Sequence, residues 1–350
     1  MPPKQPPTNL RFSFKKAVAE ARRDFPKETA KTTFADLSTP AGRQYLVKWA
    51  ETHPAIRKHP LPLRENFVME TENNALRNGF MVLTKSETDD FLLVFSGADH
   101  PTAMHFPMHS SQQFIFDHEL GHIVAPGGLS ALEKRPPKRE GTLSVAHYGE
   151  TIAQFNRGET VADTFAVLRG IQRGTLSREE IAELAMMRTF DSWAHGSYTH
   201  LTTTAIDALL AYSDTGTLAT LTPAAQLRLT ADHAAKYGLS AQDCGSLACD
   251  FYLAERDRMY NTMETEAPKH PLEQKLENLF AILSTAPENS ATFYIAARVF
   301  QSTISKGYID HVGKIETIAP GIDWDAALKK IDARAPEAVK TRLSRLPKPS

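Results

Sequence analysis

The sequence predicts an α+β protein that is mainly α, and two observations carry this prediction. Two short β-rich runs, FMVLT at 80–84 and FLLVF at 91–95, are joined by KSETDD, which is typical of a hairpin. From about residue 110 onward, apolar residues recur at helical spacing instead. We therefore expect a small antiparallel sheet, a helix directly after the hairpin, and a helical C-terminal lobe.

The N-terminal part begins with a polar, Pro-rich stretch at 1–10, for which we expect a disordered tail. The spacing of Leu10, Phe14 and Val18 predicts a short amphipathic helix after it. A second helix is expected from Pro40, because proline suits the first helical turn. These observations divide the chain into a tail (1–10), a helical N-terminal segment (11–75), a core (76–215) and a helical C-terminal lobe (216–345).

The region after the hairpin alternates helical patterns with loops. The stretch between the first two patterns is rich in Pro, Gly and charge, which predicts a long loop. We expect helices at 110–124, 158–172, 177–192, 199–212, 223–237, 245–260, 271–284, 290–305 and 324–345.

Composition and charge exclude several classes of function. The chain has 350 residues, 41% hydrophobic, and its 40 basic and 41 acidic side chains leave no field that would attract nucleic acid. No stretch reaches the roughly 18 apolar residues of a membrane span, and MPPKQPPTNL does not have the apolar run of a cleaved signal. We expect a cytoplasmic protein by default, with export by a route without a cleaved signal left open. The oligomeric state is not predicted.

The most informative motif is HELGH at 118–122, inside the apolar segment FIFDHELGHIVAP. On a helix, the i, i+4 spacing places His118 and His122 on one face, where two neutral imidazoles share a zinc ion. Glu119 lies about 100° round from His118, which suits a general base that is not itself a ligand. Pro126 ends the helix soon after His122.

Together with GETVADTFAVL at 158–168, this motif resembles the active-site helices of the zincin metallopeptidases, and specifically of the gluzincins. The resemblance implies a zincin-like core holding one Zn2+ per chain. It implies that Glu159 is the third zinc ligand beside the two histidines of 118–122. It also implies that Asp163, one turn after Glu159, orients the imidazole of His118 through a hydrogen bond.

The resemblance covers about 78–170 and separates the branches of the superfamily. Ala125 and Gly128 stand where the metzincin pattern requires Gly and His, so that branch is excluded. From the residues alone, His147 and Glu150 remain open as alternative third ligands, although neither has an Asp at i+4.

The reaction that the resemblance implies is hydrolysis of a peptide bond in a protein or peptide substrate. Zinc would lower the pKa of a water molecule to about 7, and Glu119 would take its proton. For a second donor to the oxyanion, His195 in WAHGSYTHL is the first candidate, with Tyr198 and His200 in reserve. Zincins commonly bind a peptide along an edge strand, for which we expect 91–96, with an interior place in a small sheet as the alternative for this run.

Two other functions remain open from the sequence. One is a non-catalytic zinc-binding regulatory module, which would not need a base at Glu119, although this chain has one. The other is a helical protein-interaction protein, suggested by the amphipathic helices after Ser213. Removing zinc would change neither binding nor stability in that second case.

Overall fold

The structure is a computed structural model of the whole chain. It describes residues 12–78, 80–85, 90–97, 112–128, 145–195, 198–212, 215–247 and 290–305, with five further residues between 279 and 287. The predicted tail at 1–10 and the predicted helix at 324–345 lie outside these residues, as does most of the one at 271–284.

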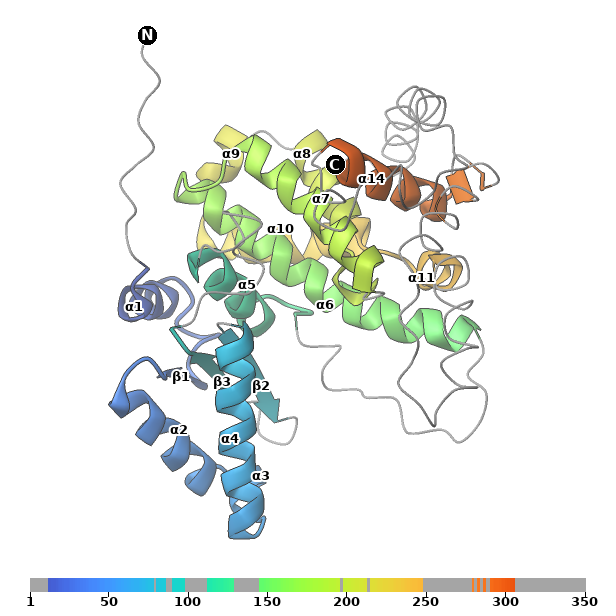
Figure 1. The fold of residues 1–350 in the computed structure, drawn as a ribbon. Helices are drawn as coiled ribbons and strands as arrows, with labels where there is room; N and C mark the ends of the chain where they lie inside the picture. The colour runs from blue at the N-terminus through green and yellow to red at the C-terminus, as the bar shows by residue number, and fades with distance from the viewer. Residues whose placement is uncertain are drawn as a thin grey trace, which may run out of the picture.

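The described part of the chain is mostly helical, with a small sheet near its N-terminal end (Figure 1). The elements run in the order α1 (Phe14–Asp24), β1 (Thr32–Asp36), α2 (Pro40–Thr52), α3 (Pro54–Arg57), α4 (Leu61–Asn78), β2 (Phe80–Lys85), β3 (Asp90–Phe95), α5 (Gln112–Val124), α6 (Val145–Gln172), α7 (Arg178–His195), η2 (Tyr198–His200), α8 (Thr203–Tyr212), α9 (Thr215–Ala219), α10 (Pro223–Tyr237), α11 (Ala241–Leu247) and α14 (Ala291–Ser305).

Several helices begin where local capping chemistry places them. The Thr39 hydroxyl accepts a hydrogen bond from the Gly42 amide at 3.1 Å, directly before Pro40, and α2 starts there as expected. Thr222 caps α10 in the same way, so that this helix has the bounds expected from its periodicity. These ends are set by residues within one turn of each other.

The sheet differs from the expected one. Its three strands lie in the order β1-β3-β2, with β2 antiparallel to β3 and β1 parallel to β3. The hairpin is therefore present, but the expectation of a wholly antiparallel sheet was wrong. The segment 11–75 is mostly helical and also contains the strand β1. TTFAD at 32–36 has a weak local strand signal and becomes a strand because it pairs with β3 across the fold.

Strand β3 lies at the centre of the sheet and is buried on both faces. Leu92 and Val94 pack against α2 and α4, whereas Leu93 and Phe95 pack against α1 and α5. The sheet therefore lies between two helical layers (Figure 1). Because both sides of β3 are hydrogen-bonded to other strands, it is not the edge strand that was expected to take a peptide.

The helical part is organised around α6, which packs against α5, α10 and α11. This helix begins at Val145, well before the expected start at 158, so the last part of the predicted loop, 145–157, is helical. The predicted helix at 199–212 is instead a short 3-10 turn, η2, followed by α8. No helix among the described residues combines the length and the apolar composition needed to cross a membrane.

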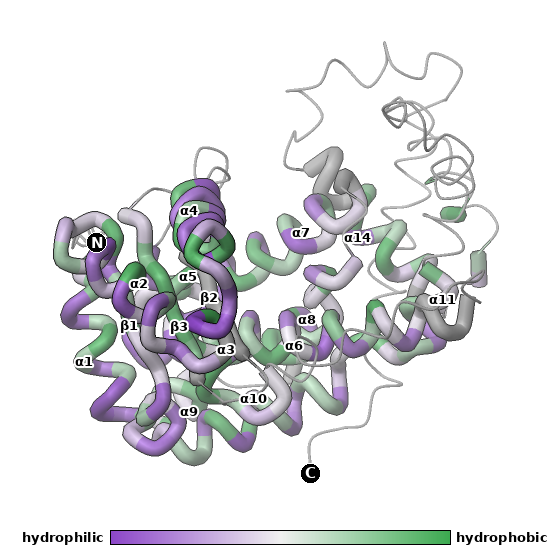
Figure 2. Tube along the Cα trace, turned by 90° about the horizontal axis from the view of Figure 1, so that it is seen from below, coloured by the Kyte–Doolittle hydropathy of each residue, from purple (hydrophilic) through white to green (hydrophobic). Residues whose placement is uncertain are grey.

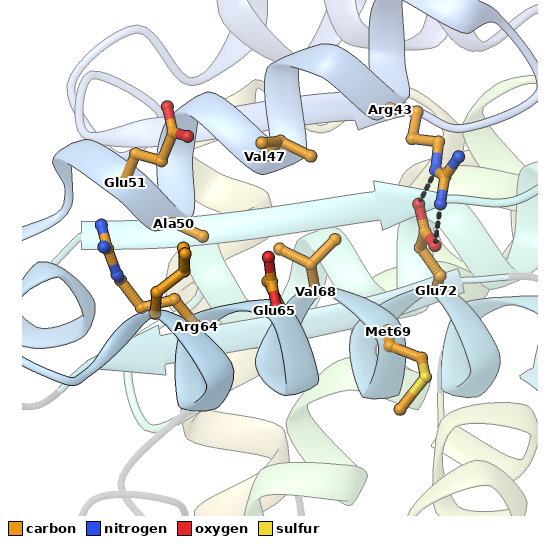
Figure 3. A pocket seen from close by; sticks show the side chains of 10 residues that line it. Arg43, Val47, Ala50, Glu51, Arg64, Glu65, Val68, Met69 and Glu72 are labelled. Carbon is orange, nitrogen blue, oxygen red and sulfur yellow. Dashed lines mark hydrogen bonds and ion pairs between the residues drawn. The ribbon is translucent and has the colours of Figure 1, made fainter.

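A cavity of about 460 Å³ opens between α2 and α4, on the outer side of the sheet (Figure 3). Its walls combine apolar side chains such as Val47 and Met69 with the ion pair between Arg43 and Glu72. Figure 2 shows hydrophobic and hydrophilic stretches alternating along α4, and Leu61, like Met69, is exposed there. The residues that line this cavity include no histidine or cysteine, so the cavity is not a candidate transition-metal site.

Candidate metal centre

Helix α5 presents two histidines toward α6. His118 and His122 are both 8% exposed, and their rings meet edge to face with centroids 4.9 Å apart. Gly121 lies between them on the helix, and a Cβ added there would come 3.0 Å from the Cα of Ala162 on α6. The absence of a side chain at Gly121 therefore lets the two helices approach closely enough to share a site.

Glu159 on α6 faces the two imidazoles. Its Oε2 lies 3.3 Å from His118 Nε2, and its Oε1 lies 3.7 Å from His122 Nε2. The ligand atoms of His118, His122 and Glu159 all lie within 4.8 Å of one another, so these three residues could hold a metal ion. Within the described residues, Glu159 Oε2 is buried and accepts no well-directed hydrogen bond, as expected of an atom whose partner is a cation.

The outer nitrogen of each imidazole has a partner of its own. His118 Nδ1 lies 2.8 Å from Asp163 Oδ1, and His122 Nδ1 lies 2.9 Å from the carbonyl oxygen of Gly128. Both partners are acceptors, so the neutral rings carry their protons on Nδ1. This leaves the Nε2 lone pairs directed toward Glu159, in the tautomer that binds a metal.

Asp163 is the most heavily bonded residue of the centre. The Arg188 guanidinium donates to it from Nε at 2.8 Å and from Nη2 at 2.7 Å, and the Thr202 hydroxyl donates at 2.6 Å. Arg188 lies on α7 and Thr202 in the turn after η2. Neither residue was expected from the sequence, because no local motif links them to 159–163.

The charges of the centre shift the pKa values of the metal-free protein strongly. Burial alone would lower the pKa of His118, but the contacts with Asp163 and Glu159 outweigh it and raise that pKa to about 10. For Glu159, the effect of burial is outweighed by His122, His200 and His118, and the pKa is lowered. The pKa of Asp163 is lowered despite its burial, chiefly by Arg188 and then by His118. The metal-free centre therefore holds a proton on His118 between two carboxylates.

The predicted donors to the oxyanion lie in different surroundings. His200 Nε2 lies 3.6 Å from Glu159 Oε2, and the side chain of His200 is 45% exposed. Burial lowers the pKa of His200, only partly opposed by Glu159. Tyr198 is buried in a hydrophobic cluster with Trp193. His195 is the last residue of α7, and its side chain lies outside the described residues.

The remaining predicted residues can also be located. Glu119 lies on α5 between the two histidines and is half-buried. Glu150 is exposed on α6, nine residues before Glu159, which corresponds to about 13 Å along a helix. His147 lies on the same helix, and its side chain is outside the described residues. Glu150 is therefore not a third ligand in this conformation.

Comparison of the chain with protein-family models, with curated protein sequences and with solved structures finds no match.

Proposed function

We propose that the protein is a zinc-dependent peptidase of the gluzincin type, with a zincin-like core formed around α5 and α6. The observation that carries the proposal is the convergence of His118, His122 and Glu159 from two helices, with Asp163 as the hydrogen-bond partner of His118. Two imidazoles and one carboxylate are a donor set that zinc accepts in catalytic sites, where a fourth position stays open.

The buried atoms of the centre fit such an ion. The under-bonded Glu159 Oε2 and the two inward Nε2 atoms would bind it, and the Nδ1 bonds of both imidazoles would fix the rings. Zinc bound there supplies positive charge that acidifies a water molecule and polarises a substrate carbonyl. In the metal-free protein, protonated His118 stabilises the buried negative charge of Glu159, so the proton on His118 and the ion would compete for one place.

The chain's own residues would perform the proton transfers. Glu119, next to the proposed ligand His118, would accept a proton from the attacking water as the new C–O bond forms, and would return it to the leaving nitrogen as the C–N bond breaks. His200, beside Glu159 and partly exposed, would donate a hydrogen bond to the developing oxyanion. Of the three candidates, His200 is the one whose imidazole the described structure places next to a proposed ligand.

The proposal is tested by metal content and by cleavage of a peptide library. Purified protein loaded with zinc should hold about one ion per chain, and Glu119→Gln should keep that ion while kcat falls by about 10²–10⁴-fold. Glu159→Gln should lose the ion, whereas Glu150→Gln on the same helix should keep both ion and activity. A wild-type protein that takes up no zinc would overturn the proposal.

A further inference from the structure

Asn156 is a fully buried amide on α6, and its bonds reach far along the chain. Its Nδ2 donates to three carbonyl oxygens: that of Leu201 at 2.9 Å, that of Thr199 at 3.2 Å and that of Tyr198 at 3.3 Å. Its Oδ1 accepts from the Leu239 amide at 3.3 Å. One side chain of α6 thus binds almost the whole of η2 and the residue after it.

The same segment is attached to α6 at a second point, through the bond from Thr202 to Asp163. Asn156 and Asp163 lie three residues before and four residues after Glu159, so all three occupy one face of α6. The segment 198–202 therefore crosses the face that carries Glu159. His200 lies within this attached segment, between Thr199 and Leu201, whose carbonyls both accept from Asn156, and its Nε2 is 3.6 Å from Glu159 Oε2.

Within the segment, the His200 imidazole has a local side-chain partner, because its Nδ1 lies 3.1 Å from the Thr199 hydroxyl oxygen. A 3-10 turn of three residues is short, and the backbone bonds at its end run from Leu201 to Tyr198 at 3.2 Å and from Thr202 to His200 at 2.9 Å. The carbonyls of this partly buried turn need donors, and the Asn156 amide supplies them for Tyr198, Thr199 and Leu201. The bonds to α6 therefore hold the segment that carries both His200 and its local partner Thr199.

We infer that Asn156 is a positioning residue, which holds His200 opposite Glu159 in the orientation that catalysis requires. Its importance for turnover rests on the proposed function, whereas its hold on the segment 198–202 does not. A buried aspartate at this position would be protonated and donate one hydrogen bond in place of several. Asn156→Asp therefore releases the segment while preserving the size of the side chain.

The test compares Asn156→Asp with His200→Ala, with the double variant, and with Val167→Ala. Val167 is a buried residue of α6 in a different hydrophobic cluster, so it controls for lost stability alone. For each protein we would measure the zinc content, and kcat and KM on a cleaved library peptide. Amide hydrogen exchange would be measured with and without zinc. Asn156→Ala serves as a second variant if Asn156→Asp does not fold.

We expect His200→Ala to lower kcat by about 100-fold, as for loss of one oxyanion donor. Asn156→Asp should come within about threefold of that loss, with unchanged zinc content and KM, and the double variant should be no slower than His200→Ala. Exchange at 198–202 should rise about tenfold in Asn156→Asp and not in Val167→Ala. The inference would be overturned if the losses of kcat in the two single variants multiplied in the double variant. It would also be overturned if Asn156→Asp showed faster exchange at 198–202 but the kcat of the wild type.

If the wild type neither binds zinc nor cleaves, the proposed function fails. Amide hydrogen exchange in the zinc-free protein then tests separately whether Asn156 holds the segment 198–202. Unchanged exchange at 198–202 in Asn156→Asp would then refute its role, and local acceleration would support it. If both Asn156 variants are unfolded, Thr202→Val is used instead, because it removes the bond to Asp163 and keeps Asn156. Amide hydrogen exchange at 198–202 must then become faster. Unchanged exchange there would overturn the model of a segment held by α6.

Discussion

Two buried aspartates of this protein are held in nearly the same way but in different places. Asp163 on α6 receives Nε and Nη2 of Arg188 and the hydroxyl of Thr202. Asp207 on α8 receives Nε and Nη2 of Arg298 and the hydroxyl of Tyr294. Each carboxylate is thus bound by one planar guanidinium and one hydroxyl, a geometry that suits a buried charge.

The difference between the two clusters is one imidazole. Asp163 Oδ1 also contacts His118 Nδ1, and His118 in turn faces Glu159. Among the described residues, the hydrogen bonds recorded for Asp207 come from Arg298 and Tyr294, both on α14, so that cluster joins α14 to α8. A buried ion pair by itself thus shows only that two helices are joined. The additional contact of Asp163 with His118 is what connects one of the two pairs to the candidate metal centre.

The largest expected effect comes from Asp163→Asn, which should lower both the stability of the protein and its affinity for zinc. Loss of the carboxylate leaves the largely buried Arg188 without its hydrogen-bonded counter-charge, and we expect the free energy of unfolding to fall by about 3–5 kcal/mol. Zinc affinity should also fall by about 10–100-fold, because His118 loses its orienting partner. Urea unfolding and zinc titration against a chelator measure the two losses. Unchanged zinc affinity would remove the distinction between the clusters.

The next effect is that of Asp207→Asn, the matched variant in the other cluster. Arg298 is left in the position that Arg188 had, so a similar fall of about 3–5 kcal/mol in the free energy of unfolding is expected. Zinc affinity should stay within about twofold of the wild type, since no described contact joins Asp207 to the centre. The same two measurements apply. A tenfold loss of zinc affinity would show that the clusters are coupled.

The third prediction concerns pH and the proton on His118. The raised pKa of about 10 means that metal-free His118 is protonated at neutral pH, whereas a ligand imidazole must be neutral. Zinc binding should therefore release about one proton, and affinity should rise about tenfold per pH unit between pH 7 and 9. Calorimetry in buffers of different ionisation enthalpy counts the proton. Binding without proton release would contradict the pKa shift.

The same shift predicts how the stability of the metal-free protein depends on pH. A raised pKa in the folded state stabilises it below the unfolded value of about 6.5, and this contribution is lost as the pH rises through about 10. The other cluster should not contribute in this window, since burial raises the pKa of Tyr294 well above its usual value of 10.0. Thermal unfolding of metal-free protein at pH 6 and pH 9 measures the loss. Equal stability at both values would argue against the contact.

The smallest effects are those of removing one hydroxyl from each cluster. Thr202→Val and Tyr294→Phe each delete a hydrogen bond to a buried carboxylate, and each should lower the free energy of unfolding by about 1–3 kcal/mol. Zinc affinity should fall a few-fold in Thr202→Val only, because Asp163 alone contacts a ligand. If both variants bind zinc as the wild type does, the hydrogen bond from Thr202 to Asp163 only joins the two segments and does not affect metal binding.

Local sequence signals predicted much of the fold because their causes act within one helical turn. The cap at Thr39 before Pro40 placed the start of α2, and the spacing of His118 and His122 placed both imidazoles on one face. The pair of Glu159 and Asp163 was expected from a resemblance to a two-helix motif. Glu159 and Asp163 both lie beside His118 in the structure.

What the tertiary structure alone decided are the contacts between segments far apart in the sequence. TTFAD became a strand because β3 offered it a hydrogen-bonding edge, and its own residues carry only a weak β signal. Arg188 and Thr202 bind Asp163, and Asn156 binds η2, through packing of α6 against α7 and the following turn. Such contacts depend on the distance between helix axes and on burial, which periodicity and capping within one element do not determine.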